Sequence, residues 1–199
     1  MTRGRVSLLV EGTTDAAVLS RLLEEVGLER GTVYRLRGGG WLGRYLAGFD
    51  HATRCSHGLV LRDPDHGEAC AAALVQRLVP SPAPLLTLRV AVRETEAWIL
   101  ADRAGLARHL RIAPSSIPRA PDELDDPKRT LVNLARRSHS RAVREDYVPR
   151  DASTSAIGPG YAGRFIEFVR RSWEPRAAAE SSPSLARCIA ALERIESSD

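Results

Sequence analysis

Short apolar runs alternate with amphipathic stretches through the first half of this chain of 199 residues. Such runs suit strands that are buried on both faces, as in a parallel sheet. We expect strands at residues 6–10, 32–36, 57–61 and 85–92. Helical periodicity fills the intervals, at residues 16–28, 41–53 and 68–79. This order predicts an α/β fold with about four strands in a mainly parallel sheet, flanked by helices and joined by right-handed crossovers.

The second half of the chain has helical periodicity and shows no further strand-like run. Helices are expected at residues 94–110, 128–137, 161–173 and 184–195. Loops rich in Pro, Ser and Gly separate these segments. We therefore predict an α/β core at residues 1–93 and a C-terminal helical extension at residues 94–199, packed on the core as one compact unit.

Cysteine content and hydropathy argue against several classes of protein. Cys55, Cys70 and Cys188 are odd in number and far apart in the sequence, so neither a disulfide framework nor a zinc knuckle is expected. No apolar run reaches the length of about 18 residues that a membrane span needs. The apolar run near the N-terminus is too short for a signal peptide. We expect a cytoplasmic protein without a membrane partner.

Basic residues slightly outnumber acidic ones, and the formal net charge is +4. This balance favours polyanionic partners, although it is also compatible with a solvated basic face. The basic stretch at residues 128–150 suits contact with a phosphate backbone, and its candidate phosphate ligands are Lys128, Arg129, Arg136 and Arg137. Aromatic residues make up only 5% of the chain, so a base-stacking platform for single strands is not expected.

Three carboxylates directly follow predicted strands. Glu11 follows the first strand, and Asp63 and Asp65 follow the third, on either side of Pro64. The carboxyl ends of parallel strands form one edge of the sheet, where α/β proteins bind their ligands. Three carboxylates gathered there would repel one another unless a cation lay between them, and Mg²⁺ or Mn²⁺ suits such oxygen ligands. Capping of the following helices is the alternative role.

Further candidates surround this edge. Glu96 could serve as a fourth ligand or orient a metal-bound water, or it could begin a helix and complement its dipole. Lys128 could hold a phosphate or remain a solvated residue at a helix start. Gly39, in the loop at residues 37–40, could let a phosphate approach the backbone, although no P-loop lysine follows it. His66 could act as a ligand or a general acid or base, or be incidental.

Two sequence motifs, VEGTTD after one apolar strand and LRDPD after another, together resemble the Toprim domain. Topoisomerases, bacterial primases and nucleases of the overcoming-lysogenization-defect class share that domain. Its glutamate corresponds to Glu11, and its DxD pair corresponds to Asp63 and Asp65. The ordered set EGxxD, GGG, DxD, ExEAWxLAD and PKxxL is most similar to a small Toprim-related bacterial family of uncharacterised proteins.

The resemblance implies a Toprim-like, Rossmann-like core and a Mg²⁺- or Mn²⁺-dependent phosphodiesterase. In particular it implies a small nuclease that acts on DNA or RNA, in a bacterial defence or toxin setting. The metal ligands would be Glu11, Asp63 and Asp65, and the assisting catalytic residues would be Glu96 and Lys128. The alternative is a non-catalytic subunit that binds metal, nucleotide or nucleic acid and joins an operon-encoded partner such as an ATPase. A homodimer is compatible with either function.

Overall fold

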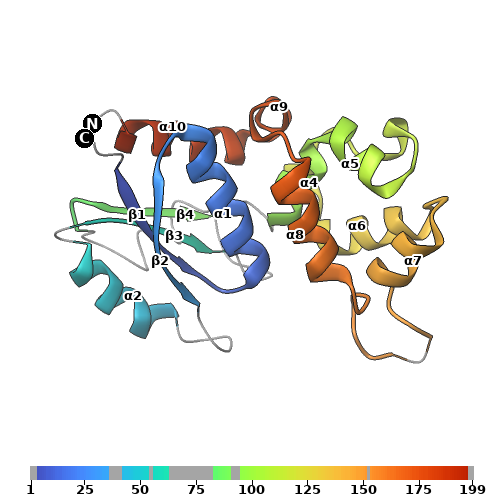
Figure 1. Ribbon diagram of the computed structural model, residues 1–199, viewed down its shortest axis with the longest axis horizontal. Coiled ribbons are helices and arrows are strands. Elements are labelled where there is room, and N and C mark those ends of the chain that lie inside the picture. The colour runs from blue at the N-terminus through green and yellow to red at the C-terminus, as the bar shows by residue number, and fades with distance from the viewer. Residues whose placement is uncertain are drawn as a thin grey trace. The chain divides into compact units, whose positions relative to one another are not determined.

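The computed structural model in Figure 1 describes residues 4–35, 42–53, 56–62, 83–90, 95–151 and 153–196. The chain divides into two compact units. The first comprises Met1–Val92 and Arg187–Asp199, and the second comprises Arg93–Ala186. The helix predicted at residues 68–79 lies outside the described residues.

The first unit contains a four-stranded sheet in which all neighbouring strands are parallel. Its strands are β1 (Arg5–Val10), β2 (Glu29–Arg35), β3 (His57–Arg62) and β4 (Leu86–Val90). Their order across the sheet is β2-β1-β3-β4. The predicted α/β fold with a parallel sheet of about four strands is therefore confirmed.

Strand β1 lies in the interior of the sheet because it is apolar on both faces. Val6, Leu8, Leu9 and Val10 are all almost completely buried, and β1 pairs with β2 on one side and with β3 on the other. Strand β2, by contrast, lies at an edge, and its side chains are mostly exposed. The prediction started β2 three residues late because its charged first residues face solvent and leave no apolar signal.

Helices α1 (Thr13–Val26) and α2 (Leu42–Ala52) cover opposite faces of this sheet. The ring of Phe49 in α2 contacts that of Tyr34 in β2, and a side chain at Gly58 in β3 would collide with Phe49. Helix α1 instead packs against β1 and β2. Since the crossovers from β1 to β2 and from β2 to β3 run in opposite directions, right-handedness puts their helices on different faces, as Figure 1 shows.

The second unit is helical, as predicted for the C-terminal part of the chain. Its helices are α4 (Thr95–Ala101), α5 (Arg103–Leu110), α6 (Pro127–Arg136), α7 (Arg141–Tyr147), α8 (Tyr161–Arg171) and α9 (Pro175–Ala179). Short 3-10 turns lie at Pro114–Ser116 and Pro121–Glu123. Helix α10 (Pro183–Glu196) begins in the second unit and ends in the first. Large buried side chains, among them Trp98, Tyr147, Phe165, Phe168 and Trp173, fill the core of the second unit.

The single helix predicted at residues 94–110 is wrong, because Asp102 divides it into α4 and α5. One carboxylate oxygen of Asp102 accepts a hydrogen bond from the Gly105 amide at 2.8 Å and so caps the start of α5. The other oxygen accepts one from the Glu174 amide at 3.1 Å. Apolar periodicity continues across the break, so the pattern alone does not reveal it.

Candidate functional site

Glu11 lies directly after β1, at the carboxyl edge of the sheet, and its side chain is exposed. The turn that follows is held by Asp15, whose buried carboxylate accepts a hydrogen bond from the Gly12 amide at 2.8 Å. A side chain at Gly12 would press against that carboxylate at 3.2 Å. The EGxxD motif therefore has a local physical explanation, since Gly12 and Asp15 fix the turn that presents Glu11.

The strand order places Glu11 beside a switch point of the sheet. From β1 the chain moves to β2 on one side, and it later enters β3 on the other side of β1. In open α/β sheets, ligands bind outside the carboxyl ends of the strands at such a point. Strand β3 runs parallel to β1 and ends at Arg62, directly before Asp63. Asp63 and Asp65 themselves lie outside the described residues, as do Gly39 and His66.

The described residues contain no group of three or more His, Cys, Asp or Glu side chains that could hold a metal ion. Two of the three predicted ligands are not among them, so the magnesium site stays a prediction. The predicted donors are all carboxylates, which are the hard oxygen ligands that Mg²⁺ and Mn²⁺ prefer. The position of Glu11 at the switch point is compatible with such a site.

In the second unit, the structure brings two predicted site residues together. Glu96, in the first turn of α4, is only 2% exposed, and the Nζ of Lys128 lies 3.6 Å from its Oε1. The hydroxyl of Tyr161 donates a hydrogen bond to the same oxygen at 2.8 Å. A buried carboxylate is costly unless it is paired and hydrogen-bonded, and these two partners meet that requirement.

The sequence interpretation missed Tyr161. This residue is the first of α8 and follows a loop rich in Gly and Pro, where no periodic pattern marks a buried hydroxyl. Glu96 holds the ammonium group of Lys128, whose side chain remains 38% exposed at the start of α6. The arrangement thus fixes one cation at a partly solvated position, where it can meet an anionic ligand.

The remaining predicted phosphate ligands lie along α6 or at its end. Arg129, Arg136 and Arg137 are all exposed. The guanidinium of Arg136 donates a hydrogen bond to the amide oxygen of Asn133 at 3.3 Å. Trp98 is fully buried, and its indole N–H donates to the hydroxyl of Ser184 at 2.7 Å.

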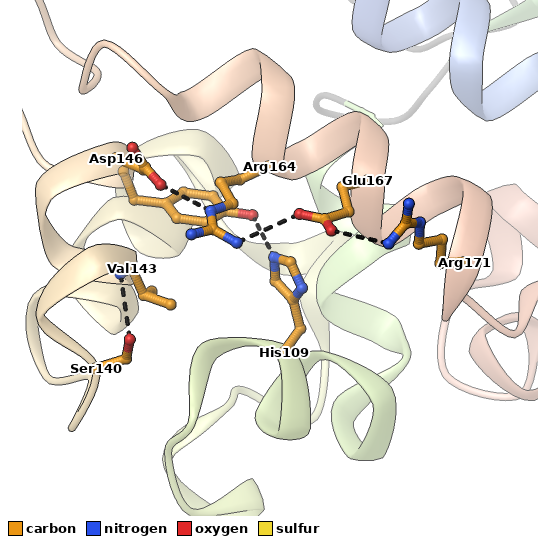
Figure 2. A network of polar contacts seen from close by, with 8 residues as sticks. His109, Ser140, Val143, Asp146, Arg164, Glu167 and Arg171 are labelled. Carbon is orange, nitrogen blue, oxygen red and sulfur yellow. Dashed lines mark hydrogen bonds and ion pairs between the residues drawn. The ribbon is translucent and has the colours of Figure 1, made fainter.

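A second polar network, drawn in Figure 2, connects α5, α7 and α8. Arg164 donates to Asp146 at 2.7 Å and to Glu167 at 3.3 Å, and Glu167 also pairs with Arg171. The hydrogen bond to Asp146 is the main cause of the raised pKa of Arg164. Every charge in this network has a partner, which indicates a structural role.

Beside that network, the imidazole Nε2 of His109 lies 3.0 Å from the hydroxyl of Tyr147. Burial lowers the pKa of His109, and burial also raises the pKa of Tyr147 well above its ordinary value. The lowered pKa favours the neutral imidazole of His109 near neutral pH, where the hydroxyl of Tyr147 is neutral in any case. Neutral partners with a stable hydrogen bond suit a packed helix interface rather than acid–base chemistry.

No protein-family model matches the chain, and searches of curated proteins and of solved structures found no significant match. Among the described residues, no helix combines the length and apolar character that crossing a membrane requires. The Toprim resemblance consequently stays a prediction that rests on the sequence motifs.

Proposed function

We propose that the protein is a divalent-metal-dependent phosphodiesterase, namely a small Toprim-type nuclease whose metal ligands are Glu11, Asp63 and Asp65. One observation carries the proposal. Glu11 is exposed at the carboxyl end of β1, at the switch point of a parallel sheet, and the neighbouring parallel strand leads directly into Asp63.

A few residues of the chain have definite tasks in this proposal. A bound Mg²⁺ or Mn²⁺ would supply polarisation of the phosphoryl group and an activated water. Gly12 and Asp15 hold the turn that orients Glu11. Lys128, held by Glu96, offers a positive charge to a phosphate of the substrate.

A second candidate function is a non-catalytic subunit that binds nucleic acid. The observation that favours it is the pairing of Glu96. Its buried carboxylate already interacts with Lys128 and Tyr161, so its charge is compensated within the protein. A glutamate in that condition has a sufficient structural role, and no assisting role in catalysis is needed to explain its burial.

Cleavage of labelled DNA and RNA in the presence of Mg²⁺ or Mn²⁺ tests the proposal. We expect the substitutions Glu11→Gln and Asp63→Asn, which remove a charge and nearly preserve size, to lower the cleavage rate by about 100-fold or more, since even indirect partners of a metal cost about 10–100-fold. Glu24→Gln is the matched control. Glu24 is an exposed glutamate of α1, so this variant should keep the full rate.

Other outcomes separate the two candidate functions. Cleavage that survives in both ligand variants contradicts the assignment of Glu11 and Asp63. Calorimetry that shows metal binding, together with no cleavage of any nucleic acid, favours the non-catalytic function. A wild-type chain that binds no divalent metal at millimolar concentration contradicts the metal site itself.

A further inference from the structure

Two helix ends with basic residues meet in the second unit. The backbone amide of His139, just after α6, donates a hydrogen bond to the backbone oxygen of Arg111, just after α5, at 3.4 Å. Exposed arginines lie at both helix ends, and a further one lies in the first turn of α6. We name this set the α5–α6 basic surface, and its residues are Arg108, Arg111, Arg129, Arg136 and Arg137.

Among the described residues, the arginines of this surface form no ion pair with an acidic side chain. Within the part of the chain that the structure describes, none of its five guanidinium groups has a carboxylate within 4.0 Å. Elsewhere in the same unit, Arg141 and Arg164 each pair with an acidic residue. The positive charge of the α5–α6 basic surface is therefore available to an external anion.

The helix dipole explains only part of this arrangement. Cations at a helix C-terminus are stabilised by the dipole, which accounts for the arginines at the ends of α5 and α6. Arg129, however, lies in the first turn of α6, where the dipole opposes a positive charge. Helical periodicity places Arg129 on the same face as Arg136, about 10 Å away along the axis. The dipole alone therefore does not account for two exposed arginines, Arg129 and Arg136, on one face of α6.

We propose that the α5–α6 basic surface binds the phosphate backbone of double-stranded nucleic acid without reading the bases. One guanidinium group can bind two oxygens of a phosphate at once, and several such groups suit the regularly spaced phosphates of a nucleic-acid backbone. The inference deepens the proposed nuclease function by naming a duplex as the substrate. It rests on that function only in calling the duplex a substrate.

The choice of a duplex follows from what accompanies the arginines. Among the described residues, the large hydrophobic side chains that are exposed are Tyr34 and Tyr45, and both belong to the first unit. The described part of the second unit therefore presents no aromatic platform on which single-stranded bases stack. It also presents no large apolar side chains for insertion into a lipid surface.

The test measures binding of a fluorescent duplex of about 20 base pairs by anisotropy, with the full chain in EDTA, over a range of salt concentrations. The slope of log K against log salt is negative, and each phosphate contact contributes about −0.9 to it. We expect Arg111→Gln/Arg137→Gln to reduce the magnitude of that slope by about 2. The control, Arg5→Gln/Arg187→Gln, removes the same charge from exposed arginines of the first unit and should leave the slope unchanged. Thermal melting verifies that both variants are folded.

Three results would overturn the inference. Equal weakening by the two double variants would show a general effect of net charge. Tighter binding of a single strand of the same length would point to a different class of ligand, and tighter binding of phosphatidylserine vesicles would point to a membrane surface.

EDTA prevents metal-dependent cleavage, so the binding experiment tests this inference separately from the proposed nuclease function. A chain that binds the duplex as expected but never cuts it with Mg²⁺ contradicts the nuclease and supports the surface. If the wild-type chain and the Arg111→Gln/Arg137→Gln variant cut the duplex at the same rate, the proposed role of the α5–α6 basic surface is contradicted and the nuclease function is supported.

Discussion

At the scale of single residues, Glu96 joins a candidate functional role to a structural one. Its carboxylate is buried beside the Nζ of Lys128 and receives the hydroxyl hydrogen bond of Tyr161. These two of its partners come from α6 and α8, whereas Glu96 belongs to α4, as does Thr95, whose hydroxyl donates to the other carboxylate oxygen at 3.4 Å. Removing the partner from α6 or the one from α8 would leave a buried charge incompletely satisfied, which is the expensive condition for any carboxylate.

We expect Tyr161→Phe to lower the free energy of unfolding by about 1–3 kcal/mol, because it removes a hydrogen bond from a buried charged group. The ring remains and should keep its contacts with Tyr147 and Phe165. Urea denaturation measures the change. Tyr34→Phe serves as the control, since Tyr34 is 49% exposed, and it should change stability by less than about 0.5 kcal/mol. Equal losses in both variants would contradict the role of the Tyr161 hydroxyl.

At the scale of elements, Asp102 shows how one polar side chain can end one helix and begin the next. It is only 5% exposed, and both of its carboxylate oxygens accept backbone hydrogen bonds. A side chain at Gly105 would collide with this carboxylate, so the glycine is part of the same cap. The contact with Glu174 joins the cap of α5 to the start of α9.

We expect Asp102→Ala to destabilise the protein by about 2–4 kcal/mol, because it removes a helix cap and leaves a second amide without its partner. Asp126→Ala offers a matched comparison. Asp126 caps α6 through a single bond to the Arg129 amide, so its loss should cost about 1 kcal/mol. Urea denaturation of both variants measures these losses in the free energy of unfolding. A loss for Asp102→Ala no larger than that for Asp126→Ala would contradict the double role.

At the scale of the whole molecule, the proposed metal site couples to folding. A ligand that binds only the folded chain raises its stability by mass action. We expect Mg²⁺ at about ten times its Kd to add about 1.4 kcal/mol to the free energy of unfolding, and EDTA to reverse the gain. Thermal melting with and without Mg²⁺ measures this. Glu11→Gln should abolish the increment and Glu24→Gln should keep it, whereas a wild-type midpoint that is indifferent to Mg²⁺ would contradict the site.

The sequence by itself determined the type and order of most elements. Strand β1 was predictable because a short run that is apolar on both faces suits the interior of a parallel sheet. The first residues of β2 were not, since an edge strand with charged side chains has no such pattern. Glu11 could be identified as a candidate because it directly follows a predictable strand. These features are local, and periodicity along the chain records them.

Only the tertiary structure decided which distant segments meet. It put β1 between β2 and β3, which creates the switch point beside Glu11. It paired Glu96 with Tyr161, 65 residues away, and it joined the ends of α5 and α6 through Arg111 and His139. The physical reason is that such contacts depend on how the helices and strands pack. A single hydrogen bond between remote residues leaves no repeating pattern in either segment from which it could be predicted.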